Sequence, residues 1–127
     1  MDYRFNHIHL LCRNLQNSID FFTQVLGASL ITHKKFGDAD GALLELNQVG
    51  INLRVHAKNE KINEDTSIPS YGYHHICVQV DDINAAYQDL TAKKVEFITP
   101  PRQTPDNDHI AFFKGPDGII FELLQLS

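Results

Sequence analysis

The sequence has few cysteines and no long hydrophobic segment. Its 127 residues include two cysteines, Cys12 and Cys77, which lie in separate apolar runs without the spacing of a zinc site. We therefore expect reduced thiols in a cytoplasmic protein rather than a disulfide framework. No apolar stretch is long enough to span a bilayer, and no long apolar segment follows a basic leader, so we expect neither a membrane anchor nor a secretory signal.

Clusters of basic residues are also missing. Lysine and arginine together number 11 against 16 aspartates and glutamates, which gives a formal net charge of −5. Phosphate binding needs clustered basic side chains, so this composition argues against nucleic acid and anionic membranes as main partners. What is present is an ordinary globular composition, 43% hydrophobic and 21% charged. The length allows one domain with a core of its own.

Apolar patterns along the chain predict eight strands and two helices. The first helix ends before Gly27, which favours helix termination, and Asp81 or Asp82 can cap the start of the second. In chain order the predicted elements are strand Phe5–Cys12, helix Leu15–Leu26, strands Ser29–Lys35, Gly41–Leu46, Ile51–His56 and His75–Val80, helix Ile83–Lys94, and strands Glu96–Ile98, His109–Lys114 and Ile119–Leu126.

The second half of this order repeats the first. When His7 is aligned with His75, an offset of 68 residues, apolar positions and turn glycines of the two halves agree without a gap. The matched pairs include Leu15 with Ile83, Phe22 with Leu90, Leu44 with Phe112 and Gly50 with Gly118. We therefore predict an α+β fold with two βαβββ repeats, which form curved mixed sheets around a cleft with the helices outside. Residues 1–127 should form a single domain, with units at about 5–57 and 73–126 joined by the linker 58–72.

Alternation along the strands sorts the histidines by face, because successive residues of a strand point to opposite sides. In the first strand His7 and His9 share one face, and an apolar set occupies the other. In the fifth strand His75 and Cys77 share a face, and His74 begins the opposite, apolar set. The apolar faces should pack on the helices. His7 and His75 should therefore point away from the helices, whereas His74 is expected to be a structural residue at the strand end.

The last strand carries one charge, Glu122, among apolar neighbours. A carboxylate in such a strand is costly unless it is paired or binds a metal. One interpretation is an ion pair with Arg54 or Arg102. The other is a metal site, because two histidines and one carboxylate that point inwards from three strands form the donor set of an open catalytic site for Zn, Fe, Mn, Co or Ni.

Four segments resemble a known family. They are Asn6-His-Ile-His-Leu10, Leu15-Gln-Asn-Ser-Ile-Asp-Phe-Phe22 with Leu26-Gly27, Tyr73-His-His-Ile-Cys-Val-Gln-Val-Asp-Asp82, and Phe113-Lys-Gly-Pro-Asp-Gly-Ile-Ile-Phe-Glu-Leu123. On these motifs essentially the whole chain resembles the vicinal oxygen chelate superfamily, which includes lactoylglutathione lyase, methylmalonyl-CoA epimerase, fosfomycin-resistance thiol transferases, extradiol dioxygenases and bleomycin-binding proteins. The resemblance implies one divalent transition metal per site, bound by His7, His75 and Glu122.

The chain departs from the family at a fourth ligand position, where the resemblance implies a glutamate in the lyase and a glutamine in the epimerase. The 68-residue offset places Arg54 opposite Glu122, and a slip of two residues on the same face places Asn52 there instead. Arginine stays protonated and cannot bind a metal. The predicted site therefore has three protein ligands.

Three further residues are candidates for substrate binding: Arg54, Asn52 and His9. Arg54 has two interpretations. It is either a solvated or salt-bridged charge, which could balance Glu122 in a metal-free protein, or a guanidinium that binds a substrate carboxylate or phosphonate through two hydrogen bonds. His9 and Cys77 follow one step further along the same faces as His7 and His75, so we expect them to line the pocket.

The leading hypothesis is a metal-dependent enzyme of the glyoxalase family, of the lyase or isomerase type. The metal would polarise vicinal oxygens of a small substrate while Glu122, as the catalytic residue, or metal-bound water moves a proton. A fosfomycin-type thiol transferase or a relative of the extradiol dioxygenases is an alternative enzyme. A metal-free drug-binding protein of the bleomycin-resistance type is the alternative of another class, although the lack of tryptophan argues against it.

The same resemblance bears on assembly. In the related small lyases, facing βαβββ units come from different chains, so that two sites form across a two-fold dimer. A sheet of four strands also leaves unpaired backbone that a second copy can cover. We therefore expect a homodimer in which each site takes His7 from one chain and His75 with Glu122 from the other.

Overall fold

The computed structural model describes all residues, 1–127, and divides into two compact units, Met1–Glu64 and Asp65–Ser127. The division falls inside the predicted linker 58–72. Each unit has the element order strand, helix and three strands, and each forms one four-stranded sheet. The predicted α+β class with two βαβββ units is therefore confirmed.

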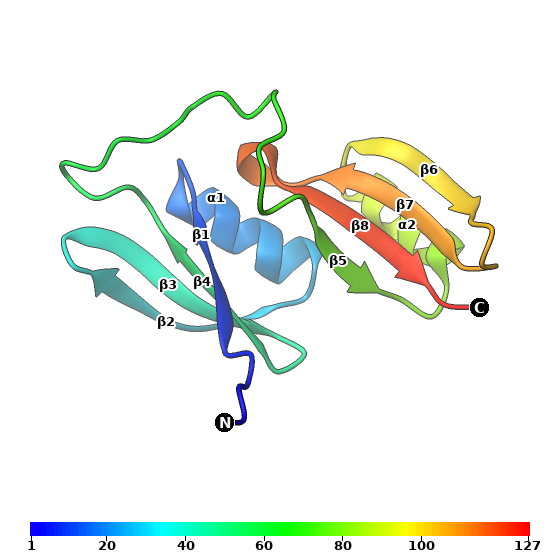
Figure 1. The fold of residues 1–127 in the computed structure, drawn as a ribbon, viewed down its shortest axis with the longest axis horizontal. Coiled ribbons are helices and arrows are strands. Elements are labelled where there is room, and N and C mark those ends of the chain that lie inside the picture. Colours follow the sequence, from blue (N-terminus) through cyan, green and yellow to red (C-terminus); the bar gives the residue numbers. More distant parts are fainter. The chain divides into compact units, whose positions relative to one another are not determined.

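The first unit contains a mixed sheet covered on one face by a helix (Figure 1). Its strand order is β1-β4-β3-β2, with β1 parallel to β4 and the other neighbours antiparallel. The elements are β1 (His7–Leu11), α1 (Leu15–Asp20) with a π-helical turn (Phe21–Val25), β2 (Ser29–Phe36), β3 (Ala39–Leu46) and β4 (Val49–Arg54).

The second unit repeats this plan with the order β5-β8-β7-β6, in which β5 is parallel to β8 (Figure 1). The prediction of a short strand at Glu96–Ile98 was wrong in extent, because β6 continues through Pro100 and Pro101. Proline is tolerated there since β6 is an edge strand, and its register is irregular at this point. The elements are β5 (Ile76–Gln79), α2 (Ile83–Ala92), β6 (Phe97–Gln103), β7 (His109–Lys114), a 3₁₀ turn (Pro116–Gly118) and β8 (Ile120–Gln125).

Both helices begin at equivalent caps. The side chain of Asn14 accepts a hydrogen bond from the N–H of Asn17, and that of Asp82 accepts one from the N–H of Ala85. Such caps satisfy backbone donors that have no partner inside the helix. The first helical segment ends at Val25, and Gly27, with a positive φ of 79°, lies in the turn that leads to β2. None of the helices is both long and apolar enough to cross a membrane.

The core of each unit lies between its helix and one face of its sheet. In β8 the buried residues Phe121 and Leu123 alternate with the partly exposed Glu122, so that the carboxylate points to the face without the helix. The ring of Phe113 in β7 lies parallel to that of Phe121, with the centroids 5.1 Å apart. The fully buried large side chains are Phe22, Leu44 and Leu53 in the first unit and Ile83, Phe113, Phe121 and Leu123 in the second.

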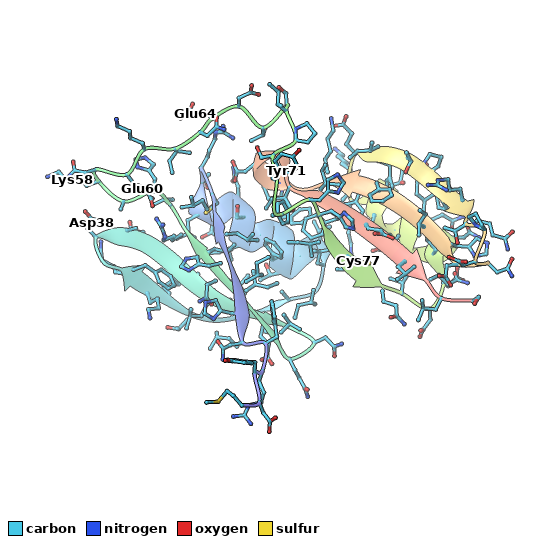
Figure 2. All side chains as sticks on the ribbon, viewed as in Figure 1. Asp38, Lys58, Glu60, Glu64, Tyr71 and Cys77 are labelled. Atoms are coloured by element: carbon cyan, nitrogen blue, oxygen red, sulfur yellow. The ribbon has the colours of Figure 1, made fainter.

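A bidentate ion pair between Arg54 and Glu60 links the segment after β4 to that strand. Arg54 Nη1 lies 2.7 Å from Glu60 Oε1, and Nη2 lies 2.8 Å from Oε2. Glu60 also accepts a hydrogen bond from the N–H of Ala57. Figure 2 labels Glu60 and Lys58 on this segment and Asp38 at the turn between β2 and β3, whose carboxylate accepts a bond from the N–H of Lys58. The chain leaving β4 is thereby fixed to its own unit.

The packing of Phe113 leads to a prediction about stability. Because its side chain is fully buried, replacement by alanine should leave a cavity and lower the free energy of unfolding by about 3–5 kcal/mol. The matched control is Phe112→Ala, one residue earlier on the opposite, partly exposed face, which should lower it much less. Urea denaturation of both variants measures the difference, and equal losses would contradict the assignment of faces.

The Arg54–Glu60 pair leads to a prediction about pH. The guanidinium of Arg54 is the main cause that lowers the pKa of Glu60 from its ordinary value of 4.5 to about 2. A group with a depressed folded-state pKa contributes stability that is fully present above its unfolded pKa, here 4.5, and is lost as the pH falls towards 2. Glu60→Gln should therefore flatten the fall in unfolding free energy across this window and change its pH dependence little above it.

Denaturation curves recorded across this pH window test this expectation. Asp40→Asn is the control, because it removes the ion pair of Asp40 with Lys35, in which both side chains are about two-thirds exposed. Such exposed pairs contribute little, so this variant should change the curve much less. An acid dependence that Glu60→Gln leaves as steep as in the wild type would show that the pair does not couple to folding.

Candidate functional site

The strongest chemical feature of the second unit is a histidine beside a carboxylate. His75 Nε2 lies 2.8 Å from Glu122 Oε2, with the two side chains 30% and 18% exposed. His75 directly precedes β5, and Glu122 lies in β8 opposite Cys77. Neighbouring residues of a parallel pair point to the same side. The parallel pairing of β5 and β8 therefore brings together two residues that are 47 apart in the sequence.

Other contacts hold the His75 ring. Its Nδ1 lies 2.8 Å from Nδ1 of His74, and its ring is nearly perpendicular to that of Phe112, with the centroids 5.6 Å apart. His74 is exposed and lies before the strand, with its ring in a hydrogen bond as expected for a strand-end residue. The sequence interpretation, however, did not connect His74 or Phe112 with His75.

In the first unit, His7 and His9 lie on the exposed side of β1. His7 Nδ1 is 2.7 Å from Asn6 Oδ1, so Nε2 is the ring nitrogen left to bind a metal. The ring of His9 packs on Phe36, with the centroids 4.6 Å apart. Partial burial lowers the pKa of His9, and the nearby charges of Arg54 and His7 lower it further. These effects favour the neutral imidazole, which can donate or accept a hydrogen bond.

The strand registers identify the residue that corresponds to Glu122 in the first unit. In the parallel pairs, His9 faces Asn52 just as Cys77 faces Glu122. The antiparallel pairs agree, because Asn52 faces Leu43 in β3 and Glu122 faces Phe112 in β7. Asn52 is thus the structural equivalent of Glu122.

The gap-free alignment, which set Arg54 against Glu122, is therefore wrong in the last strand of each unit. Its error accumulates in two steps of one residue. Leu43 and Phe112, which face Asn52 and Glu122, are 69 residues apart, so the first step lies before β7. The second step lies in the turn before the last strand, because four residues separate the paired Glu45 and Gly50 and five separate the equivalent Lys114 and Ile120. The offset at Asn52 and Glu122 is therefore 70, and a slip of two residues keeps each side chain on its original face.

Arg54 is already paired with another side chain, and Cys77 is poorly suited to act as a nucleophile. Both terminal nitrogens of Arg54 bond to Glu60, so the salt-bridge partner is Glu60 of the same unit. Cys77 lies on β5 (Figure 2). Burial raises the pKa of its thiol, and the charge of Glu122 raises it further. The reactive thiolate is therefore disfavoured at neutral pH.

The donor chemistry of the His75–Glu122 pair fits a transition metal. Imidazole nitrogen and carboxylate oxygen both bind first-row metals at about 2.0–2.2 Å, and two such donors on one metal lie about 3 Å apart when they subtend a right angle. The observed separation is 2.8 Å. Within either unit, no group of three or more His, Cys, Asp and Glu side chains is arranged to hold a metal. The pair supplies two of the three predicted ligands, and the third, His7, belongs to the other unit.

Comparisons with known proteins agree with the fold. A probable lactoylglutathione lyase from Vibrio cholerae is 33% identical over 138 residues, which cover 98% of this chain and 91% of that protein. Mitochondrial methylmalonyl-CoA epimerase from Dictyostelium discoideum is 30% identical over 129 residues, which cover 94% of this chain and 76% of that protein.

Solved structures show the same architecture. The crystal structure of a glyoxalase family protein from Enterococcus faecalis matches with a TM-score of 0.82 at 18% identity, covering 96% of this chain and 97% of that one. Residues 4–123 match the model of the glyoxalase family. With the repeated βαβββ units, these matches show that the chain belongs to the Glyoxalase/Bleomycin resistance protein/Dioxygenase superfamily.

Proposed function

We propose that the protein is a metal-dependent enzyme of the lyase or isomerase type, which moves a proton between carbon atoms, or between the two faces of one carbon, next to a carbonyl group. The observation that carries the proposal is the 2.8 Å approach of His75 Nε2 to Glu122 Oε2 on the helix-free side of the second sheet. His75, Glu122 and His7 would hold one divalent transition metal. The bound metal would act as a Lewis acid that polarises the oxygens of the substrate.

Glu122 is the proposed catalytic base. Its carboxylate would remove the proton from the carbon next to the carbonyl, the electron pair of the C–H bond would move onto the carbonyl oxygen, and the proton would then be returned to carbon. A side chain only 18% exposed is partly shielded from water, which favours proton return over exchange with solvent.

Asn52 supports this branch of the family. Its position is equivalent to that of Glu122, so the first unit offers a neutral amide oxygen where the second offers a carboxylate. An amide oxygen can bind a hard metal weakly or accept a hydrogen bond from a substrate hydroxyl. His9, which pairs with Asn52, extends the same face. Arg54 is engaged by Glu60 instead of being open to a phosphonate, which argues against the thiol transferase alternative.

The proposal predicts the metal affinity of single variants. His75→Ala and Glu122→Ala should each lower the affinity for Zn²⁺ by more than about 100-fold, because each removes a ligand from a set of three. His33→Ala, an exposed histidine on β2, is the matched control and should bind as the wild type does. Competition with a chromophoric chelator measures these constants. A wild-type protein that binds no divalent metal more tightly than His75→Ala would instead favour the metal-free binding protein.

The proposal also predicts the effect of Glu122→Gln on turnover. Lactoylglutathione and methylmalonyl-CoA are the first compounds to test, because similar proteins are named for them. Glu122→Gln keeps the shape of the side chain but removes the base, so the conversion of a compound that the wild type accepts should slow by about 10²–10⁴-fold. NMR follows this conversion directly. An unchanged rate would show that another group moves the proton.

We further propose a homodimer whose metal sites are shared. Each site would take His7 from one chain and His75 with Glu122 from the other. Support comes from the sheet edges, because β1 and β5 are both edge strands and each leaves one backbone side without a partner in its own sheet. Unpaired strand edges are covered in most native proteins.

Complementation tests the shared site. His7→Ala and Glu122→Ala chains each lack a ligand, and a mixed dimer would contain one site with all three ligands and one with neither His7 nor Glu122. Mixing the two chains under exchange conditions should therefore restore tight Zn²⁺ binding, with about one Zn²⁺ bound per mixed dimer. Native mass spectrometry confirms that the chains exchange. Exchange without recovered binding would assign the site to a single chain.

A further inference from the structure

Each of the two proposed metal histidines is hydrogen-bonded by the side chain of the residue directly before it. His7 Nδ1 lies 2.7 Å from Asn6 Oδ1, and His75 Nδ1 lies 2.8 Å from His74 Nδ1. Asn6 and His74 are 68 residues apart, the offset that also relates His7 to His75. The same contact therefore occurs at the same position of both repeats, with two different chemical groups.

This contact matters because a histidine that binds a metal has two distinct ring nitrogens. One binds the metal through its lone pair, and the other carries the proton and donates it to a nearby acceptor. The amide oxygen of Asn6 can only accept a hydrogen bond, so it favours the ring form of His7 with the proton on Nδ1. Nε2 of His7 is then left with its lone pair for a metal.

His74 can serve both states of His75, because a neutral imidazole carries one donor and one acceptor nitrogen. Without a metal, His75 Nε2–H can donate to Glu122, and His75 Nδ1 then accepts from His74. When a metal takes the lone pair of Nε2, the proton of His75 lies on Nδ1 and is donated to His74. The His74–His75 bond is kept in both states by a change of ring tautomer.

We infer that Asn6 and His74 are positioning residues, which orient the rings of His7 and His75 so that Nε2 of each is directed to the metal. This inference rests on the proposed metal site and extends it beyond the three ligands. It also changes the role of His74, which the sequence pattern assigned to structure alone. Both residues are exposed, so neither contributes to the core and their replacement should not unfold the protein.

Zn²⁺ titration of the protein tests the inference. Asn6→Ala and His74→Ala should each weaken Zn²⁺ binding by about 10–100-fold, as expected when the hydrogen-bond partner of a metal ligand is lost. Asn6→Asp retains an acceptor oxygen, and His74→Asn places in the second repeat the residue found in the first. Both should bind within about threefold of the wild type, or more tightly, because an acceptor for Nδ1–H is kept.

The matched controls repeat the same substitutions at exposed positions away from the proposed site. Asn17→Ala lies in α1 and His33→Ala in β2, and both should leave Zn²⁺ affinity unchanged. Thermal unfolding of every metal-free variant verifies the fold. Alanine variants that bind Zn²⁺ as the controls do would overturn the inference.

Ring ¹⁵N NMR of the metal-free protein gives a second readout that needs no metal. His7 should show the tautomer with hydrogen on Nδ1, and Asn6→Ala should shift its population towards Nε2–H, whereas Asn17→Ala should not. His74→Ala should change the ring ¹⁵N shifts of His75. If the wild type binds no Zn²⁺, the proposed metal site fails, and these shifts alone decide the positioning roles. Ring shifts that stay the same in both alanine variants would overturn them.

Discussion

The parallel pairing of the first and last strand within each unit is the constraint on which the rest of the structure depends. β1 pairs with β4 and β5 with β8, and each pair lies next to the antiparallel strands that complete the sheet. A slip of one residue would turn Glu122 towards the helix and expose Phe121 and Leu123, both fully buried. The register that buries the core is therefore the one that brings Glu122 to His75, and packing and site chemistry cannot vary independently.

The two repeats share their backbone plan but differ in chemistry. At the equivalent position of the last strand the first unit has the neutral Asn52 and the second the charged Glu122. Before the histidine the first unit has Asn6, which can only accept a bond through its oxygen, and the second has His74, which can donate or accept. The second unit thus carries the negative charge and the adaptable partner, while the first offers neutral groups. In the proposed shared site, the two kinds of unit would therefore contribute different groups.

Arg54 illustrates how a local ion pair removes a residue from a functional role that its strand position suggests. It lies two residues beyond Asn52 on the same face of β4, opposite Leu11, and this position led to the hypothesis of substrate binding. The segment after β4 turns back and brings Glu60 to it, with two short hydrogen bonds. Glu60 lies in a charged stretch without periodicity, so no pattern in the sequence indicates this contact.

The sequence by itself determined the number and order of the elements, the repeat and the faces of the strands. These depend on local periodicity, which each short segment carries alone, and His109–Lys114 even matches β7 residue for residue. Pairing by contrast depends on contacts between distant residues. Only the tertiary structure decided that Asn52 and not Arg54 corresponds to Glu122, because one additional residue before β7 and one in the turn before β8 shift the offset from 68 to 70. The contact of Arg54 with Glu60 was also beyond the sequence, since a hydrogen bond to a side chain depends on where another segment runs and leaves no periodic signal.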